Sequence, residues 1–258
     1  MAQTAMKNNQ QHPSTAPSTA SPEEIARFTA IADAWWDPAG DFAPLHQLNP
    51  VRLEFIRDHI ASHFGRDALA TQPLNGLDII DIGCGGGLLA EPMRRMGATM
   101  TGIDAGKKNI DVARLHAEQS GLSIDYHHRL PEDLGSEKAR YDVVLNMEVV
   151  EHVADLDVFL GAAANLVRPG GVMVLSTLNR TLKSLALAKI GAEYILRWLP
   201  VGTHDWRKFV RPSELAAGLK PYGVDISKLK GMTFSPIDRD WRLSQDLGVN
   251  YLAFGVKR

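Results

Sequence analysis

Short apolar runs alternate with amphipathic stretches along most of the chain. The apolar runs predict β-strands, and the stretches with apolar residues at helical spacing predict the helices between them. The expected strands lie at 77–82, 98–103, 122–128, 141–146 and 172–177, and the expected helices at 86–96, 107–120 and 153–167. Short apolar strands that alternate with helices are typical of a parallel sheet covered on both faces, so we expect an α/β fold.

Further elements are expected on both sides of this alternating region. Before it, the Ser-Pro-Glu-Glu run at 21–24 is a typical helix start, and a second helix is expected after Asn49-Pro50. After it, apolar-rich runs at 224–234 and 249–256 predict a hairpin-like pair of strands that closes the sheet. The chain thus predicts a seven-stranded, mostly parallel, Rossmann-like sheet with helices on both faces.

The first 21 residues differ in composition from the rest. They are rich in Ser, Thr, Gln, Asn and Pro and have almost no large apolar side chains. Burial could not offset the entropy cost of ordering such a segment. We therefore expect a disordered tail at 1–21 and a single domain at 22–258, with an insert at about 178–211 after the fifth strand.

Overall composition narrows the class of protein. The 258 residues are 45% hydrophobic, enough for one substantial core, and a formal net charge of −2 produces no field that would attract nucleic acid. A single cysteine, Cys84, cannot form an internal disulfide. The sequence shows neither a secretory signal nor a run that could span a bilayer. We therefore expect a cytoplasmic protein without a nucleic-acid partner.

Candidate chemistry is concentrated after the first predicted strand. Asp81 precedes a glycine-rich turn at 83–87, and Asp104 ends the second strand. A glycine-rich turn at the carboxyl end of a parallel strand lets the backbone approach a ligand closely. A dinucleotide site would need a third glycine where Leu88 stands, and Asp81 would repel a pyrophosphate. The turn therefore argues against a nicotinamide cofactor.

A cationic ligand that contains a ribose fits the two carboxylates better. S-adenosylmethionine (SAM) carries a sulfonium and an amino group, which an acidic pocket tolerates, and ribose hydroxyls that Asp104 could bind. We therefore predict SAM, bound by Asp81, Asp104 and the turn glycines Gly83 and Gly85. The alternative is structural: Asp81 would cap the turn, and Asp104 the helix that follows.

Several longer motifs resemble one family. They are D-I-G-C-G-G-G-L-L-A-E, G-I-D-A, M-E-V-V-E-H-V, L-V-R-P-G-G, S-T-L-N-R-T, A-E-Y-I-L-R-W-L-P-V-G-T-H-D-W and the upstream W-W-D-P-A-G-D-F-A-P-L-H-Q-L-N-P-V-R. Over about residues 22–258 the chain resembles the ubiquinone biosynthesis O-methyltransferases, which are class I SAM-dependent enzymes. The resemblance implies that Gly83 and Asp104 contact SAM, that Arg52 closes over it, and that Met147 lines the adenosine pocket.

The resemblance also implies a reaction. The family methylates ring hydroxyls of polyprenyl-substituted phenols and catechols, namely 2-polyprenyl-6-hydroxyphenol and 3-demethylubiquinol, so the expected substrate is lipophilic. Methyl transfer is an in-line displacement in which the enzyme mainly holds the acceptor oxygen against the methyl group. A phenol ionises at about pH 10, so at neutral pH a base or a metal ion must favour the phenolate.

Three side chains after the fourth predicted strand are candidates for this task. The offsets of three and four between Glu148, Glu151 and His152 would place them on one side of a helical turn. Two carboxylates and an imidazole can bind a divalent ion. The resemblance implies Mg²⁺, although an imidazole also suits manganese, iron or zinc. Without a metal, His152 becomes the leading base beside Glu148; the alternative is a helix start with a packed histidine.

The insert holds the remaining candidates. His204 and Asp205 are either a second acid/base pair, with His204 catalytic, or a capping turn. The segment 181–200 is largely apolar; Lys189, Glu193 and Arg197 form a polar stripe at every fourth residue, and Lys183 lies off this stripe. It predicts either a helix packed on the sheet or an amphipathic helix in a lipid interface. Expected partners are therefore an anionic membrane surface, with peripheral attachment to its inner face, and other ubiquinone-pathway enzymes.

Other functions are open at this stage. A class I SAM methyltransferase that acts on another small-molecule acceptor would share every cofactor residue, and only the flanking motifs argue against it. A nicotinamide-dependent dehydrogenase is disfavoured by Leu88 and Asp81. A lipid-binding protein built on a methyltransferase scaffold would bind the substrate without catalysis.

Overall fold

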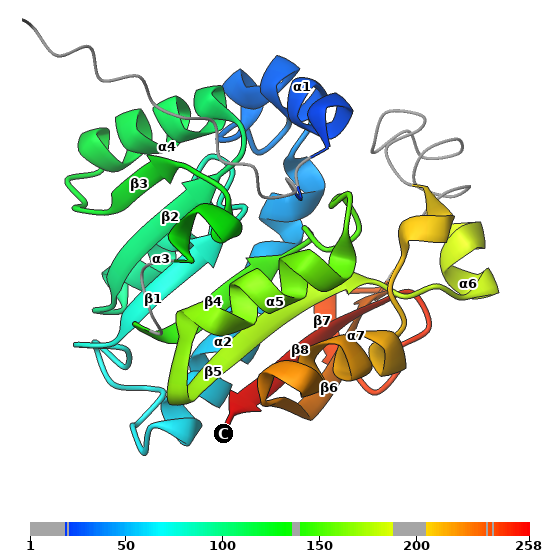
Figure 1. Cartoon of the computed structure of the whole chain (residues 1–258). Helices are drawn as coiled ribbons and strands as arrows, with labels where there is room; N and C mark the ends of the chain where they lie inside the picture. Colours follow the sequence, from blue (N-terminus) through cyan, green and yellow to red (C-terminus); the bar gives the residue numbers. More distant parts are fainter. Residues whose placement is uncertain (1–18, 20, 136–139, 188–204, 236, 239) are drawn as a thin grey trace, which may run out of the picture.

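One mixed β-sheet forms the centre of the protein, with helices on both faces (Figure 1). The computed structural model describes residues 19, 21–135, 140–187, 205–235, 237–238 and 240–258. The strands are β1 (Asp78–Ile82), β2 (Thr99–Asp104), β3 (Asp125–His128), β4 (Tyr141–Met147), β5 (Val167–Leu178), β6 (Val224–Ser235), β7 (Asp240–Ser244) and β8 (Asn250–Lys257). Their order is β3-β2-β1-β4-β5-β8-β6-β7. The first five strands run parallel and β8 is antiparallel to β5, which confirms the predicted α/β class.

The described sheet has eight strands, whereas the sequence predicted seven. The additional strand is β7, which pairs antiparallel with β6 at the edge of the sheet. It has no continuous apolar run, because only Trp241 and Leu243 pack on the core and the other three residues of the strand are polar. The predicted closing pair also differs in detail: β8 lies between β5 and β6 and pairs antiparallel with both.

The hydrophobic core consists of two layers, one between each face of the sheet and the helices that cover it. The described helices are α1 (Pro22–Ala30), α2 (Ala43–His63), α3 (Ala90–Arg95), α4 (Lys107–Gln119), α5 (Leu156–Leu166), α6 (Leu182–Ser184) and α7 (Pro212–Leu219). Short 3₁₀ turns lie at Ala32–Ala34, Pro131–Leu134, Trp206–Lys208 and Lys220–Tyr222. Side chains of α2, α3 and α4 pack on the sheet face that carries Ile79, and those of α5 and α7 pack on the face that carries Ile80. Alternate residues of β1 thus serve opposite layers.

Helix α2 begins earlier than predicted. It starts at Ala43 and contains Pro50 in its interior, although a proline has no N–H to donate and normally begins or kinks a helix. Asn49, which the sequence suggested as the residue before the helix, instead donates its side-chain amide to the carbonyl of Leu88 at 2.8 Å. The helix is held by its buried face, including Phe55, so tertiary packing outweighs the local cost of the proline.

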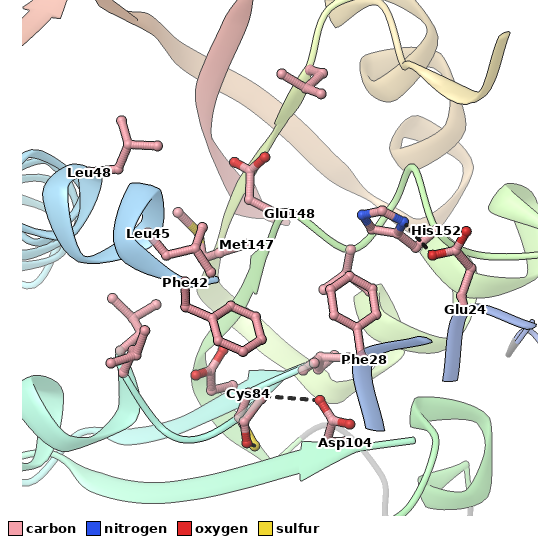
Figure 2. A pocket seen from close by; sticks show the side chains of 18 of the residues that line it. Glu24, Phe28, Phe42, Leu45, Leu48, Cys84, Asp104, Met147, Glu148 and His152 are labelled. Carbon is pink, nitrogen blue, oxygen red and sulfur yellow. Dashed lines mark hydrogen bonds and ion pairs between the residues drawn. The ribbon is translucent and has the colours of Figure 1, made fainter. Parts of the chain in front are cut away.

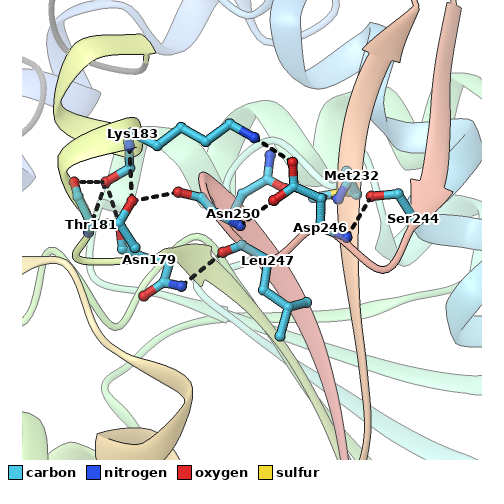
Figure 3. A network of polar contacts seen from close by, with 10 residues as sticks. Asn179, Thr181, Lys183, Met232, Ser244, Asp246, Leu247 and Asn250 are labelled. Atoms are coloured by element: carbon cyan, nitrogen blue, oxygen red, sulfur yellow. Dashed lines mark hydrogen bonds and ion pairs between the residues drawn. The ribbon is translucent and has the colours of Figure 1, made fainter.

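The described part of the insert is tied to the loop between β7 and β8 (Figure 3). Asn179 donates its side-chain amide to the carbonyl of Leu247 at 2.7 Å, and Lys183 forms an ion pair with Asp246. Residues 188–204 lie outside the described residues, as do 1–18 and 20 of the expected tail. Within the described ranges, no helix has the length and apolar character needed to cross a membrane.

Candidate active site

A cavity of about 730 Å³ lies beyond the carboxyl ends of β1, β2 and β4. Its floor comes from these strand ends, and its cover from α1, α2 and the chain between them. Every predicted cofactor residue lines it, together with two of the predicted catalytic residues: Arg52, Asp81, Gly83, Gly85, Asp104, Met147, Glu148 and His152. Figure 2 shows the labelled members of this set around one space. The predicted cofactor residues and the predicted base therefore share a single cavity.

The turn at 83–87 consists mostly of glycine partly because neighbouring side chains leave no room for a Cβ there. Gly83 and Gly85 have positive φ angles of 75° and 53°, which favour glycine. A Cβ on Gly83 would lie 2.4 Å from Val149, and one on Gly85 would lie 2.3 Å from the ring of Trp35. The sequence predicted close approach of a ligand; the structure adds close approach of the protein itself, which no local pattern indicated.

Asp104 is built into the glycine turn. One carboxylate oxygen accepts the N–H of Gly85 at 3.0 Å, and the other accepts the N–H of Gly106 at 2.7 Å and the side-chain amide of Asn109 at 2.9 Å. Burial raises the pKa of Asp104, and these hydrogen bonds oppose the rise. The carboxylate therefore has a structural role in the turn while it also faces the cavity, but it does not cap α4, whose N-cap is Gly106 without a side-chain cap hydrogen bond.

Asp81 lies at the end of the same wall with only 3% of its surface exposed. Burial, with a smaller contribution from the charge of Asp104, raises the pKa of Asp81 to about 7. Ionisation of a buried carboxyl is unfavourable in the protein without a ligand, but it becomes favourable once a cationic ligand lies beside the carboxyl. The free-energy cost of burying the carboxyl of Asp81 in the cavity wall is thus an indication of ligand binding.

This carboxyl should make the stability of the ligand-free protein depend on pH. The folded pKa lies above the ordinary value of 3.8, so the unfolded chain loses this proton first, and stability falls as pH rises from about 4 to about 7. Asp81→Asn removes the effect. We expect the difference in unfolding free energy between the variant and the native protein to increase in favour of the variant by up to about 1.4 kcal/mol per pH unit in that window. Above it, the difference should stay constant.

Denaturant titrations at several pH values, without SAM, measure this difference. Asp78→Asn is the matched control, because Asp78 is exposed at the start of the same strand. Equal pH dependence of the two variants would contradict the assignment.

Glu148 is held in a strained position at the end of β4. Its φ of 56° is the one positive φ among the described non-glycine residues, and such a backbone conformation costs energy. The carboxylate accepts the hydroxyl of Ser176 at 2.6 Å and pairs with Arg52 Nη2 at 2.9 Å. Arg52 is 5% exposed, and its Nε has no hydrogen-bond partner within the described part of the chain. A buried guanidinium with a spare donor is suited to an anionic ligand group.

His152 faces the cavity from the loop that follows β4. Its Nδ1 lies 3.1 Å from Glu24 Oε2, and the ring of Phe28 packs edge-on against the imidazole at a centroid distance of 5.3 Å. The hydrogen bond with His152 is the largest influence on Glu24 and lowers its pKa below the ordinary value. Both contacts come from α1, a helix more than a hundred residues away in sequence, and no sequence pattern indicated them.

Glu151 points elsewhere. It is 3% exposed, does not line the cavity, and accepts the hydroxyl of Thr177 at 2.8 Å. Burial, together with the charge of Glu148, raises the pKa of Glu151 to about 7. The predicted helical turn that would align Glu148, Glu151 and His152 is wrong, because α5 begins only at Leu156 and the chain before it forms irregular turns.

The cover of the cavity contains residues that the sequence analysis did not single out. The ring of Trp35 stacks on Phe42 at a centroid distance of 3.7 Å and donates its N–H to Asn109 at 3.0 Å. Trp36 donates its N–H to the carbonyl of Gly86 at 2.9 Å. The W-W dipeptide served only as a family motif, yet both indoles hold the chain after α1 onto the glycine turn.

Comparison with known proteins decides the family. A family model described as a methyltransferase domain matches residues 46–229. A protein of Paramagnetospirillum magneticum named ubiquinone biosynthesis O-methyltransferase is 59% identical over 239 residues, which cover 93% of this chain and 96% of that protein. One of the same name from Cereibacter sphaeroides is 55% identical over 244 residues and 94% and 99% of the two chains. The chain belongs to the ubiquinone biosynthesis O-methyltransferase family.

Solved structures agree with the fold of this O-methyltransferase. The magnesium protoporphyrin IX methyltransferase of Synechocystis PCC 6803 with bound SAH aligns with a TM-score of 0.61 at 19% identity, over 92% of this chain and 94% of that one. A possible histamine N-methyltransferase of Thermotoga maritima aligns with a TM-score of 0.58 at 15% identity, over 92% and 99%. At these identities the likeness concerns the class I methyltransferase fold alone.

The metal ligands predicted for the O-methyltransferase do not form a site as they are arranged. Glu148 is engaged by Arg52 and Ser176, Glu151 faces Thr177, and His152 pairs with Glu24. Across the described ranges, no group of three or more His, Cys, Asp or Glu side chains could hold a metal ion. A metal at these residues would therefore require them to give up their present partners.

Two further features of the O-methyltransferase are the predicted pair in the insert and the single cysteine. His204 lies outside the described residues. Asp205 accepts the backbone N–H of Arg207 at 3.0 Å, as the capping alternative expects. Cys84 is 6% exposed, and burial raises the pKa of its thiol, which suits a packing role rather than a nucleophile.

Proposed function

We propose that this O-methyltransferase transfers a methyl group from SAM to a ring hydroxyl of two polyprenyl-substituted intermediates, 2-polyprenyl-6-hydroxyphenol and 3-demethylubiquinol. The observation that carries the proposal is the single cavity in which Asp81 and Asp104 share walls with Glu148 and His152. The names of the relatives, which cover almost the whole chain, support ubiquinone biosynthesis as the setting.

In this proposal the polar part of the cavity binds SAM. Asp104 accepts hydrogen bonds from the ribose hydroxyls, and Asp81 faces the cationic end of the ligand. Arg52 has a spare Nε donor for the methionyl carboxylate. Met147, at the end of β4, offers a polarizable surface to the adenine.

His152 acts as the base for the acceptor hydroxyl. Its imidazole takes the phenolic proton, the resulting oxygen attacks the methyl carbon, and the carbon–sulfur bond breaks to leave S-adenosylhomocysteine. Glu148, fixed by Ser176 and Arg52, orients the acceptor; it lies on the side of the imidazole remote from Glu24 (Figure 2). The transfer converts a sulfonium to a neutral thioether, so a closed apolar environment favours the transition state over the charged reactant.

The remaining walls are suited to a lipophilic acceptor. Apolar side chains from α2 and from the β6–β7 hairpin enclose the space beside Glu148: Leu45, Leu48, Met232, Phe234 and Trp241. Phe234 is 38% exposed, so the apolar lining reaches the surface of the protein. A polyprenyl chain could leave the cavity along such a surface without passing through water.

Transfer of a labelled methyl group tests the proposal. Purified protein with methyl-labelled SAM should methylate a short-chain demethylubiquinol and a short-chain 2-polyprenyl-6-hydroxyphenol. A shorter phenol without a prenyl group is the matched acceptor control. SAM binding by calorimetry without transfer to either prenylated acceptor would favour the alternative, a methyltransferase for another small molecule.

A divalent metal, Mg²⁺ or another ion, at Glu148, Glu151 and His152 stays a hypothesis from the sequence. It predicts that EDTA abolishes turnover and that the added ion restores it, since the acceptor oxygen would then be ionised by the metal. Activity is measured after dialysis against EDTA, with and without Mg²⁺ or Mn²⁺. Turnover that survives the chelator, and that no ion raises, would leave His152 as the base.

The insert carries the last part of the proposal. We place His204 on the substrate side, and the segment 181–200 at an anionic membrane surface where other enzymes of the pathway deliver the substrate. Liposome flotation with anionic lipid measures the attachment. If the native protein does not float with the liposomes, and Ile195→Glu gives the same flotation result as the native protein, membrane docking is contradicted.

A further inference from the structure

The candidate base receives a carboxylate from a distant part of the chain. Glu24 lies on α1 and places Oε2 3.1 Å from His152 Nδ1 (Figure 2). An ionised carboxylate can only accept hydrogen bonds, so Nδ1 carries the proton in this contact and Nε2 carries a lone pair. In Figure 2 the imidazole lies between Glu24 and Glu148, and its edge remote from Glu24 is turned toward the side where Glu148 lies.

The chain before α1 is docked beside His152 as well. The carbonyl of Thr19 accepts the N–H of Ala154 at 2.8 Å, two residues after His152. The backbone N–H and the hydroxyl of Thr19 donate to the carboxylate of Glu132 at 2.7 and 3.0 Å, and Thr19 is 1% exposed. Phe28 supports the other side of the imidazole. Three contacts from residues 19–28 therefore converge on the loop that carries His152.

We propose that Glu24 is a positioning residue for methyl transfer: it holds the imidazole of His152 in the orientation and tautomer that present Nε2 to the acceptor hydroxyl. The inference rests on the proposed role of His152. Because Glu24 belongs to α1, the base is complete only while α1 lies over the cavity. The arrangement has the logic of an orienting carboxylate behind a catalytic histidine.

Several charged groups surround this pair and stay in place in the test. Arg27 pairs with Glu24 at 2.8 Å on the same helix, and Lys208 lies near enough to act on Glu24 electrostatically. Glu151, whose pKa is influenced by the charges of Glu148 and His152, lies on the same loop as His152. A variant at Glu24 must therefore be compared with one that changes a neighbouring charge but keeps the contact with His152.

Kinetics of single and double variants test the proposal with the full chain and a short-chain demethylubiquinol. Glu24→Ala should lower kcat by roughly tenfold to a hundredfold, with KM for the acceptor and Kd for SAM nearly unchanged. Glu24→Gln should restore most of kcat, because an amide oxygen still accepts from Nδ1–H. Glu23→Ala is the matched control, since Glu23 is an exposed neighbour on the same helix.

The same measurements show how the proposal would fail. In a His152→Asn background, Glu24→Ala should have no further effect on kcat; an equal further loss would mean that Glu24 merely holds α1 in place, and would overturn the proposal. Full activity of Glu24→Ala would also overturn it. If the native protein methylates no prenylated acceptor, the proposed function fails instead, independently of Glu24.

Discussion

We expect Asp104→Ala to lower the affinity for SAM by roughly a hundredfold, which corresponds to about 2.7 kcal/mol. The carboxylate would otherwise accept the ribose hydroxyls, and the net loss of one charge-assisted hydrogen bond of this kind amounts to about 1.5–3 kcal/mol. Its removal also releases the N–H groups of Gly85 and Gly106, which it now holds at 3.0 and 2.7 Å. Calorimetric titration with SAM measures the loss.

Two further variants give this result its meaning. Asp104→Asn retains an oxygen for Gly85 but loses the charge, so it separates ribose binding from support of the turn. Asp111→Asn changes an exposed acid on α4, paired with Lys107, and should leave the affinity unchanged. An affinity of Asp104→Ala equal to that of the native protein would remove the central element of the cofactor assignment.

His152→Asn should lower kcat by roughly a hundredfold to a thousandfold while the Kd for SAM stays the same. General base catalysis contributes about 10²–10⁴ in rate, and asparagine fills similar space without a group that accepts the phenolic proton. Steady-state methylation of the short-chain acceptor gives kcat, and calorimetry gives the cofactor affinity. A comparable loss of both quantities would point to a damaged fold rather than to a missing base.

A second histidine provides the control for this variant. His127→Asn alters a half-exposed residue on β3 that pairs with Asp125, away from the cavity lining. It should retain native turnover. Native turnover in His152→Asn itself would instead assign the proton to another group, with His204 and a metal-bound acceptor as the next candidates.

The sequence predicted most of the fold because the parallel half of the sheet obeys simple patterns. Strands β1, β4 and β5 each contain a continuous run of buried residues, so their apolar runs stand out. Strand β7 was not predicted because an edge strand with one buried face shows only an alternation of apolar and polar residues, here with Trp241 and Leu243 as the apolar ones. The predicted helix was shorter than α2 because Pro50 is a strong local signal for a helix start. In the structure, burial of Phe55 and its neighbours overrides that signal.

The cofactor side of the cavity was also predictable, whereas the catalytic side was not. Asp81 and Asp104 lie at the carboxyl ends of β1 and β2, and the parallel register of these strands brings them to one edge of the sheet. The partners of His152 depend on contacts between residues 19–28 and 152–154, which no local pattern encodes. The expected helical face at 148–152 failed because Glu148 leaves the helical region of φ and Asp155 starts the helix by accepting the N–H of Val158.

The interior place of β8 has a consequence for synthesis on the ribosome. Strands β6 and β7 emerge before β8, yet β6 joins the parallel half only through β8. Until residues 250–257 leave the exit tunnel, the nascent sheet ends at an open edge on β5, and a preformed β6–β7 hairpin must wait beside it. Such an edge readily captures other strands, so this interval is when the growing polypeptide most needs shielding by chaperones.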